Sequence, residues 1–326
     1  MDTRKVAVDL RGGAIVKNAS PFHSGELAVQ RLTGEVENAA INAGGFMDAI
    51  PPGGVAFVER QRTVAVSGIG SDAGMWVTLI SGDPGFAQVV SEDRRQLRLL
   101  LADPAMRSYD PVFASLSPGA AVGSLLIDLS TRRRLRANGN VLEVTDASLT
   151  YELHEVFGNC PKYIQKRAPT EYGAASTNLG EIGGEQIGPE AMALIARCDT
   201  AFVGSSDGAG HADASHRGGP PGFIRVDAGQ NQLKIPDYPG NGMFNTLGNL
   251  TVDPRIGLCL VDFAQRMQLQ ISGVASFDFS QRDGELEPTG GTGRWWSVKI
   301  GRWRLSGLPS PAGWNAPEPS PYNPPG

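Results

Sequence analysis

Cysteine is scarce in this sequence. Only Cys160, Cys198 and Cys259 occur among 326 residues, and none belongs to a Cys-x-x-Cys pair. The histidines His23, His154 and His211 are scattered, without the spacing that metal ligands show. We therefore expect no metal site, and reduced thiols favour a cytoplasmic protein.

Long hydrophobic runs and excess positive charge are also lacking. No segment approaches the roughly 18 apolar residues of a membrane span, and no signal peptide is expected at the start. The formal net charge of -5 gives no general attraction to nucleic acid or to anionic membranes. Because no GxGxxG motif follows an expected strand, a dinucleotide-binding Rossmann unit is not supported either.

What the sequence does contain is an internal repeat. Its first two blocks keep a constant offset of 137 residues (187 − 50), and the third is shifted by a three-residue shortening. The aligned blocks are 50–63 with 187–200, 75–86 with 212–223, and 123–139 with 257–273. Three collinear blocks in the same order indicate duplication of a whole domain.

Each copy combines a proline-started helix with short apolar strands and Gly/Asp-rich turns. Many short strands and few helices favour a mainly β fold of two small antiparallel barrels in tandem. The expected divisions are an N-terminal extension with a helix (1–40), a first, degenerate barrel (41–145), a connector (146–186), a second barrel (187–306) and a proline-rich tail (307–326).

Several runs resemble the pyridoxamine 5'-phosphate oxidase-like, FMN-binding split-barrel family, and in particular its long, two-barrel members. They are FHSGELAVQ (22–30), FGNCPKYIQKR (157–167), ADASHRGGPPGFIRV (212–226), IPDYPGNGMFNTLGNLTVDPRIGLCLVDF (235–263) and LQISGVA (269–275). The resemblance implies a six-stranded antiparallel split barrel, with FMN in the groove between two barrels. Those barrels would pair within one chain or between the chains of a homodimer, and the sequence leaves both arrangements open.

The second copy carries the better anion site. Its hydroxyl, imidazole and guanidinium groups stand beside two glycines in the run Ser215, His216, Arg217, Gly218 and Gly219. The corresponding first-copy run is Thr78 to Gly82, in which Ile80 takes the place of Arg217. We expect His216 and Arg217 to be the catalytic residues, with His216 as the proton donor, whereas a change at Ile80 should hardly affect cofactor binding unless it disturbs packing. The alternative is a solvated hairpin end.

Further candidate cofactor-binding residues lie elsewhere in the sequence. A loop rich in amides and glycines suits a flavin edge or phosphate, although an ordinary Asn/Gly turn would look alike. Gln268 and Gln270 alternate on one strand and so face the same side of the sheet, where the first copy has Arg134 and Arg136. These arginines would serve the flavin phosphate, unless the run from Arg132 to Arg134 is an exposed basic turn. The remaining candidates are Asn241, Asn245, Thr246, Asn249 and Lys162, with a nucleophilic role for the nearby Cys160 disfavoured.

These observations predict an FMN-dependent oxidoreductase that acts on a small molecule with oxygen or NAD(P)H as redox partner. In such enzymes the cofactor carries the redox chemistry and the protein supplies position and electrostatics. Two alternatives stay open: a non-catalytic barrel that stores flavin or haem, and a deazaflavin-dependent reductase. The substrate is not identified by the sequence.

Overall fold

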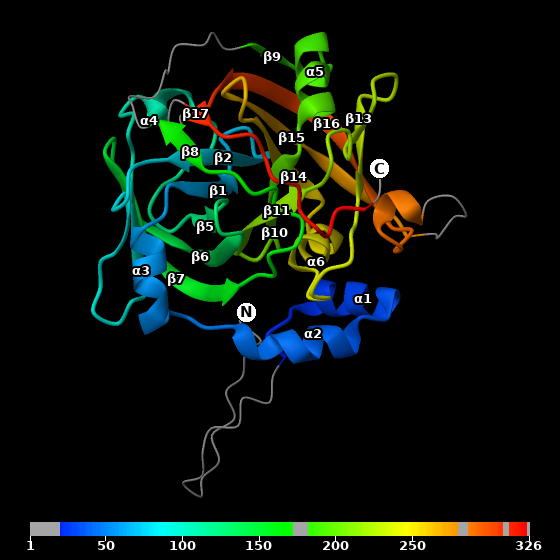
Figure 1. The fold of residues 1–326 in the computed structure, drawn as a ribbon. Helices are drawn as coiled ribbons and strands as arrows, with labels where there is room; N and C mark the ends of the chain where they lie inside the picture. Colours follow the sequence, from blue (N-terminus) through cyan, green and yellow to red (C-terminus); the bar gives the residue numbers. More distant parts are fainter. Residues whose placement is uncertain (1–19, 172–181, 280–285, 309–312, 325–326) are drawn as a thin grey trace, which may run out of the picture.

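The structure, a computed structural model, describes residues 20–171, 182–279, 286–308 and 313–324. Within these ranges the chain is mainly β, with two large antiparallel sheets, a small two-stranded sheet and short helices around them (Figure 1). Neither large sheet is closed by hydrogen bonds in the described part of the chain. The predicted mainly β fold of split antiparallel barrels is confirmed.

The first sheet has the strand order β2-β1-β5-β6-β7-β4-β3. Neighbouring strands are antiparallel throughout. The strands are β1 (Thr63–Ile69), β2 (Met75–Ser81), β3 (Ala87–Val89), β4 (Gln96–Leu100), β5 (Ala121–Asp128), β6 (Arg133–Val144) and β7 (Ser148–Gly158).

The second sheet repeats this order strand for strand as β11-β10-β14-β15-β16-β13-β12, and β9 (Ile182–Gly184) pairs additionally with β16. Its other strands are β10 (Thr200–Ser206), β11 (Ala212–Gly218), β12 (Arg225–Asp227), β13 (Gln232–Pro236), β14 (Arg255–Asp262), β15 (Met267–Asp278) and β16 (Trp295–Gly307). An equal strand order in both halves is what duplication of one domain produces.

One predicted boundary is wrong. The connector was expected to begin at residue 146, yet β7 lies between β6 and β4 as an inner strand of the first sheet. Alternate residues Leu149, Tyr151 and Leu153 are buried, which is the period-2 pattern of a half-buried strand. The first sheet therefore extends to Gly158. The boundary was placed too early because no repeat block covers this segment. The tail also pairs, since β17 (Gly313–Trp314) joins β8 (Pro169–Glu171).

The predicted N-terminal extension supplies two helices rather than one, α1 (Ser24–Thr33) and α2 (Val36–Asn42), while residues 1–19 lie outside the described ranges. Helix α1 begins with a capping box, in which the His23 side chain accepts from a main-chain N–H and Glu26 accepts from the main chain of His23. The other helices are α3 (Val55–Glu59), α4 (Met106–Tyr109), α5 (Pro189–Arg197) and α6 (Asn245–Val252), with 3-10 turns η1 (Ala43–Gly45), η2 (Pro52–Gly54) and η3 (Glu287–Thr289).

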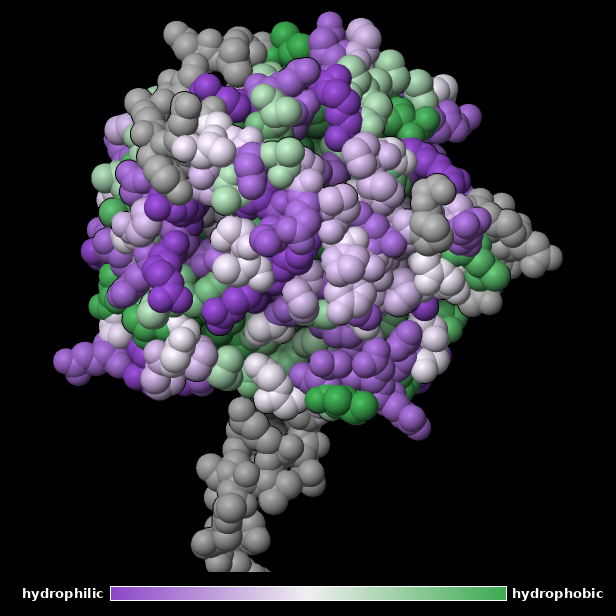
Figure 2. Space-filling view, viewed as in Figure 1, coloured by the Kyte–Doolittle hydropathy of each residue, from purple (hydrophilic) through white to green (hydrophobic). Residues whose placement is uncertain are grey.

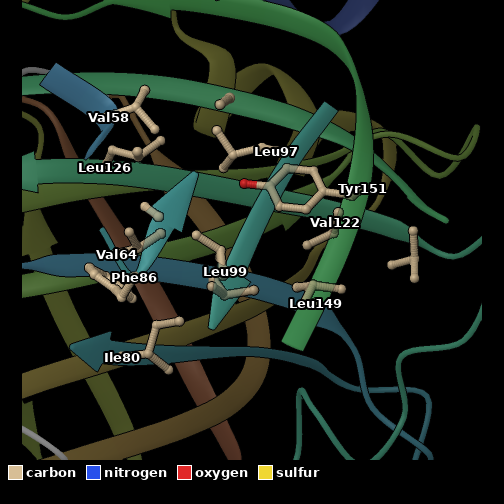
Figure 3. Packing of buried hydrophobic residues seen from close by; sticks show 14 of the residues in the cluster. Val58, Val64, Ile80, Phe86, Leu97, Leu99, Val122, Leu126, Leu149 and Tyr151 are labelled. Atoms are coloured by element: carbon tan, nitrogen blue, oxygen red, sulfur yellow. The ribbon is translucent and has the colours of Figure 1, made fainter. Parts of the chain in front are cut away.

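Each sheet packs one face into its own hydrophobic core. Figure 3 shows the first core, where Val64, Ile80 and Tyr151 converge from different strands. A separate cluster fills the second barrel around Trp296, which is fully buried. These two clusters account for the alternation of large apolar residues in both copies.

The other faces of the two sheets pack against each other within the chain. Ala65, Leu125 and Phe202 belong to a third cluster shared by strands of both sheets. Two glycines allow the backbones to approach closely at this seam. A Cβ on Gly123 would lie 2.5 Å from the main-chain carbon of Asp213, and one on Gly257 would lie 2.8 Å from the main chain of Trp76. The two barrels therefore pair inside one chain.

The surface on the face drawn in Figure 2 is largely hydrophilic, with hydrophobic residues in small separate groups. Among the helices in the described ranges, none is both long and apolar enough to cross a lipid bilayer.

Candidate functional site

A polar pocket lies at the seam between the two sheets. Strand β6 of the first sheet forms one wall and β11 of the second sheet forms the opposite wall, while the loop before α6 and the segment after β7 complete it. The cavity measures about 130 Å³. Pockets that enclose a whole drug-sized ligand measure roughly 300–1,000 Å³, so this volume suits one charged end of a ligand that extends outwards.

The pocket brings together ten of the predicted site residues from four separate segments of the chain. Its charged and polar lining also includes residues that the sequence did not indicate, described below. The ten are Arg134, Arg136, Lys162, Ser215, His216, Arg217, Gly218, Asn241, Asn245 and Thr246.

Four predicted residues do not line this pocket. Gly219 follows the end of β11, where a Cβ would meet the Phe223 side chain. Asn249 lies one helical turn beyond Asn245, donates to the Ser205 hydroxyl over 3.0 Å and lines a neighbouring cavity. The remaining two, Gln268 and Gln270, project from β15 toward β2 instead.

Gln270 fills the position in the second copy that Arg136 occupies in the first. Its amide donates to the carbonyl of Val77 over 2.9 Å and to the hydroxyl of Thr78 over 2.7 Å, and its side chain is fully buried. Thr78 in turn donates to Asp110 over 2.7 Å. Burial raises the pKa of Asp110. Within the described residues, the side chains of Gln270 and Thr78 therefore occupy the counterpart of the space beside Arg136.

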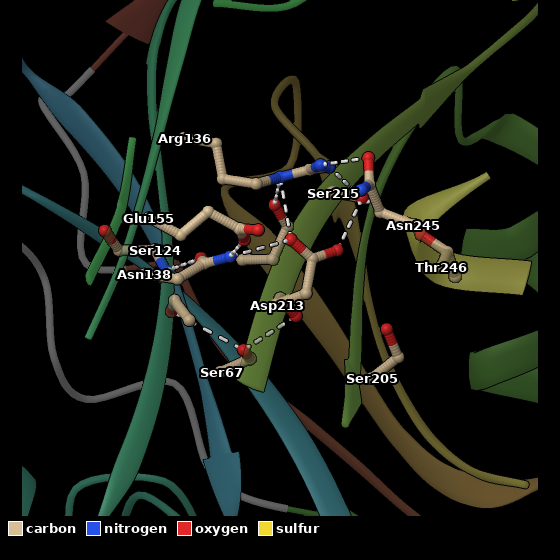
Figure 4. Close-up of polar contacts among 12 residues, drawn as sticks. Ser67, Ser124, Arg136, Asn138, Glu155, Ser205, Asp213, Ser215, Asn245 and Thr246 are labelled. Carbon is tan, nitrogen blue, oxygen red and sulfur yellow. Dashed lines mark hydrogen bonds and ion pairs between the residues drawn. The ribbon is translucent and has the colours of Figure 1, made fainter. Parts of the chain in front are cut away.

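Arg136 joins the two walls rather than offering free donors. Its Nε lies 2.7 Å from a carboxylate oxygen of Asp213 in a buried ion pair, and its Nη1 donates to Asn245 over 2.8 Å (Figure 4). It also donates to the Ser215 hydroxyl, which itself donates to Asp213 over 2.9 Å. Arg136 thus positions β11 and Ser215, and the prediction that it binds a ligand phosphate directly is not what this geometry favours.

Two other guanidinium groups lack a carboxylate partner in the described part of the chain. Arg134 donates to the carbonyl of Cys160 over 2.6 Å, and its Nε is buried without a hydrogen bond. Arg217 donates only to the carbonyl of His216, over 3.1 Å. Burial and the neighbouring guanidinium groups lower the pKa of Arg134 to about 9. Burial likewise lowers the pKa of Arg217. Within the described residues, neither guanidinium is thus hydrogen-bonded to a carboxylate, and the charge of Asp237 acts on Arg217 only from a distance.

His216 lies beside these two arginines with both ring nitrogens buried and without a hydrogen-bond partner. Burial, then the charges of Arg134, Arg217 and Arg167, lower its pKa well below the usual value. A neutral imidazole has one donor and one acceptor to offer a ligand. The imidazolium form that a proton donor needs is disfavoured in the pocket without an anion, contrary to the sequence-based expectation.

Sequence reasoning missed several residues of the pocket. Glu35 comes from α2, and nothing in its local sequence marks it as part of a site. Asp237 forms a buried ion pair of 2.7 Å with Arg294, and the ring of Tyr163 lies 4.8 Å from that of Tyr238. Tyr163 and Phe244 have positive φ values of 66° and 58°. Such strain in non-glycine residues often accompanies functional sites.

Cys160 provides a direct probe of this pocket. It is half-buried and lines the cavity, whereas Cys198 and Cys259 are fully buried. Burial raises the pKa of Cys198 to about 12 and also raises that of Cys259. We expect an alkylating reagent to modify Cys160 first, since thiolate formation and access control the rate. Peptide mass spectrometry after short exposure would measure this, and faster labelling of Cys198 or Cys259 would contradict the assigned burial.

The chain is similar to several solved structures. No family model and no curated protein matches the chain. HupZ of Group A Streptococcus is 16% identical, with a TM-score of 0.29 over 39% of this chain and 98% of its own. An FAD-binding protein of Mesorhizobium loti is 9% identical, with a TM-score of 0.29 over 39% of this chain and 99% of its own.

A third solved structure is a Clostridium acetobutylicum protein of the pyridoxinephosphate oxidase family related to general stress protein 26. It is 13% identical, with a TM-score of 0.24 over 36% of this chain and 81% of its own. At such TM-scores the likeness carries no argument by itself, and the fold rests on the strand order of the two sheets. Of these three structures, the Mesorhizobium loti protein is described as FAD-binding and the Clostridium acetobutylicum protein as a member of the pyridoxinephosphate oxidase family.

Proposed function

We propose that the pocket binds the phosphate end of FMN, and that the chain is an FMN-dependent oxidoreductase acting on a small molecule. Oxygen or NAD(P)H would serve as the redox partner. One observation carries the proposal. Among the described residues, Arg134 and Arg217 line the pocket without a hydrogen-bonded carboxylate, and the ring nitrogens of the neighbouring His216 have no hydrogen-bond partner. Groups of this kind are costly to bury unless a ligand satisfies them.

The residues present fit such a ligand. Guanidinium groups bind phosphate oxygens through charge-assisted hydrogen bonds, and Lys162 adds a third cation at the pocket wall. Gly218 allows the main chain of Tyr163 to approach β11 closely, because a Cβ at residue 218 would lie 2.1 Å from the carbonyl oxygen of Tyr163. Toward the loop before α6, the rings of Tyr163 and Tyr238 offer an apolar surface beside the amide of Asn241. A bound flavin would supply the hydride or electron transfer, while these residues hold and orient it.

The phosphate should dominate affinity. We expect FMN to bind at one molecule per chain and riboflavin to bind at least about tenfold more weakly, since charge-assisted hydrogen bonds contribute roughly 1.5–3 kcal/mol each. Titration calorimetry with both compounds measures the affinity ratio and the stoichiometry together. Equal affinities would contradict the assignment of the cationic wall to phosphate. Two FMN molecules per chain would contradict the finding that Gln270 fills the second groove.

The catalytic part of the proposal needs a separate experiment. Protein that retains FMN should be reduced by NAD(P)H or by a substrate and reoxidised by oxygen, which absorption spectroscopy follows directly. A retained flavin that cannot be cycled would favour the storage alternative. A retained deazaflavin in place of FMN, or a haem spectrum, would identify the other cofactors considered from the sequence.

A further inference from the structure

A second, smaller cavity adjoins the candidate pocket and shares Asn245 with it. It measures about 40 Å³ and lies among α1, β7, β11 and α6. Titratable groups from distant parts of the chain gather here: His23, Glu26, His154, Glu155, Asp207, His211 and Asp213. Glu26, although it belongs to the N-terminal extension, is the group that connects this cavity to the pocket.

The connection is a continuous chain of hydrogen bonds. One carboxylate oxygen of Glu26 accepts from the side-chain amide of Asn245 over 2.5 Å. The amide oxygen of Asn245 then accepts from Nη1 of Arg136 over 2.8 Å. Arg136 continues to Ser215 on the opposite wall of the pocket, as Figure 4 shows for the last three residues.

Counting donors and acceptors shows why a proton on Glu26 would alter this chain. The other carboxylate oxygen of Glu26 accepts from the main-chain N–H of His23 over 2.9 Å, so both oxygens act as acceptors. A protonated carboxyl group becomes a donor at one oxygen and needs an acceptor there. The main-chain N–H of His23 cannot turn, whereas the Asn245 amide can rotate and present its oxygen. That rotation would point the NH2 group of Asn245 at Arg136, which is itself a donor.

We propose that Glu26 is a positioning residue for the pocket, and that its proton reorients Asn245 and thereby frees Nη1 of Arg136 for a bound anion. This inference rests on the proposed function, because it concerns affinity for the same phosphate-bearing ligand. Arg136 keeps its ion pair with Asp213 in both states, so the wall itself stays in place.

The charges around Glu26 set the pH at which the change occurs. Glu155 on β7 and Asp213 on β11 face it, and His23 lies 3.7 Å away on the same helix end. Burial and the two carboxylates raise the pKa of Glu26 to about 8. Below this pH the Glu26 carboxyl is protonated and carries no negative charge, and Nη1 of Arg136 is available as a donor. Affinity for an anion should therefore be highest below about pH 8 and should fall as the pH rises through it.

FMN titration at about pH 7 and about pH 9 tests this coupling, since the phosphate is close to dianionic over that range. We expect the wild-type Kd to rise about tenfold, within the usual range of coupling between sites. Glu26→Gln keeps a donor facing Asn245 and should hold the pH 7 affinity at both values. Glu37→Gln, an exposed residue on α2, is the matched control and should behave as wild type.

Each remaining outcome decides the matter. Asn245→Ala should lose most of the pH dependence although Glu26 keeps its charge, and full dependence in this variant would overturn the relay. A fall in Glu26→Gln as large as that of wild type would overturn the role of Glu26, because the fall would then come from another group such as the Arg134 guanidinium, whose pKa is lowered to about 9. An unchanged wild-type Kd would overturn the coupling alone. Failure of wild type to bind FMN at either pH would instead overturn the proposed function, and this inference with it.

Discussion

Replacing Arg217 with alanine should weaken FMN binding by roughly ten- to hundredfold, or about 1.5–3 kcal/mol for lost charge-assisted hydrogen bonds. The structure gives the reason, because this guanidinium makes no ion pair with any described residue and donates its hydrogen bond to the carbonyl of His216. Removing it therefore breaks no ion pair of the fold. Fluorescence titration of FMN measures the effect, and an unchanged affinity would refute the assignment of Arg217 to the site.

The control for this change has to come from the surface. Ile80, the matched position in the first copy, lies in the hydrophobic core and is 3% exposed. Its replacement by alanine would cost roughly 2–5 kcal/mol of stability and would not isolate binding. Arg60→Ala is the better comparison, since this residue is exposed at the end of α3. Substitutions at such surface positions change stability little, so both stability and FMN affinity should be retained.

Gly123→Ala should destabilise the chain by about 1–3 kcal/mol or more, the usual cost of overpacking. The added methyl group would lie 2.5 Å from the main-chain carbon of Asp213 and 2.7 Å from the nitrogen of Ala214. Neither atom can move without displacing β11, which carries Ser215 and Arg217. FMN affinity should therefore fall together with the midpoint of urea unfolding.

Gly158→Ala is the matched glycine control. It ends β7, where an added Cβ meets no atom within 4 Å. Alanine narrows the unfolded ensemble slightly, so its stability should equal or slightly exceed that of wild type. If Gly123→Ala unfolds at the same urea concentration as Gly158→Ala, the close approach of the two sheets at this point is not as described.

The predicted site residues that the structure brings together at one pocket are mainly those chosen for their local chemistry. Ser215, His216 and Arg217 stand where the first copy has the apolar run around Ile80. Buried polar side chains are costly without a partner, so this contrast indicated which copy carries the pocket. The mainly β fold was predicted from short apolar runs separated by turn residues, because this pattern is typical of antiparallel strands. The match between the two sheets follows from the same repeat blocks.

Other features depend on tertiary contacts that no local pattern records. Gln270 and Arg136 occupy matched positions on their strands, yet one fills its groove and the other joins two walls. Their roles differ because the facing strands differ: β2 presents a carbonyl and a hydroxyl to Gln270, whereas β11 presents a carboxylate to Arg136. Glu26 on α1 and Glu35 at the start of α2 belong to the predicted N-terminal extension. The packing of α1 and α2 near α6 and the loop before it brings Glu35 to the pocket and Glu26 to the adjoining cavity. The low pKa of His216 likewise arises from burial, and then from cations supplied by three separate segments.

The seam that forms the pocket has a consequence for experiments in dilute solution. Arg134 and Arg217 stand on different sheets, but a single chain carries both. Linked partners meet at an effective concentration set by the linker and not by the amount of protein. The pocket should thus stay assembled at any dilution, and its affinity for a ligand should not depend on protein concentration.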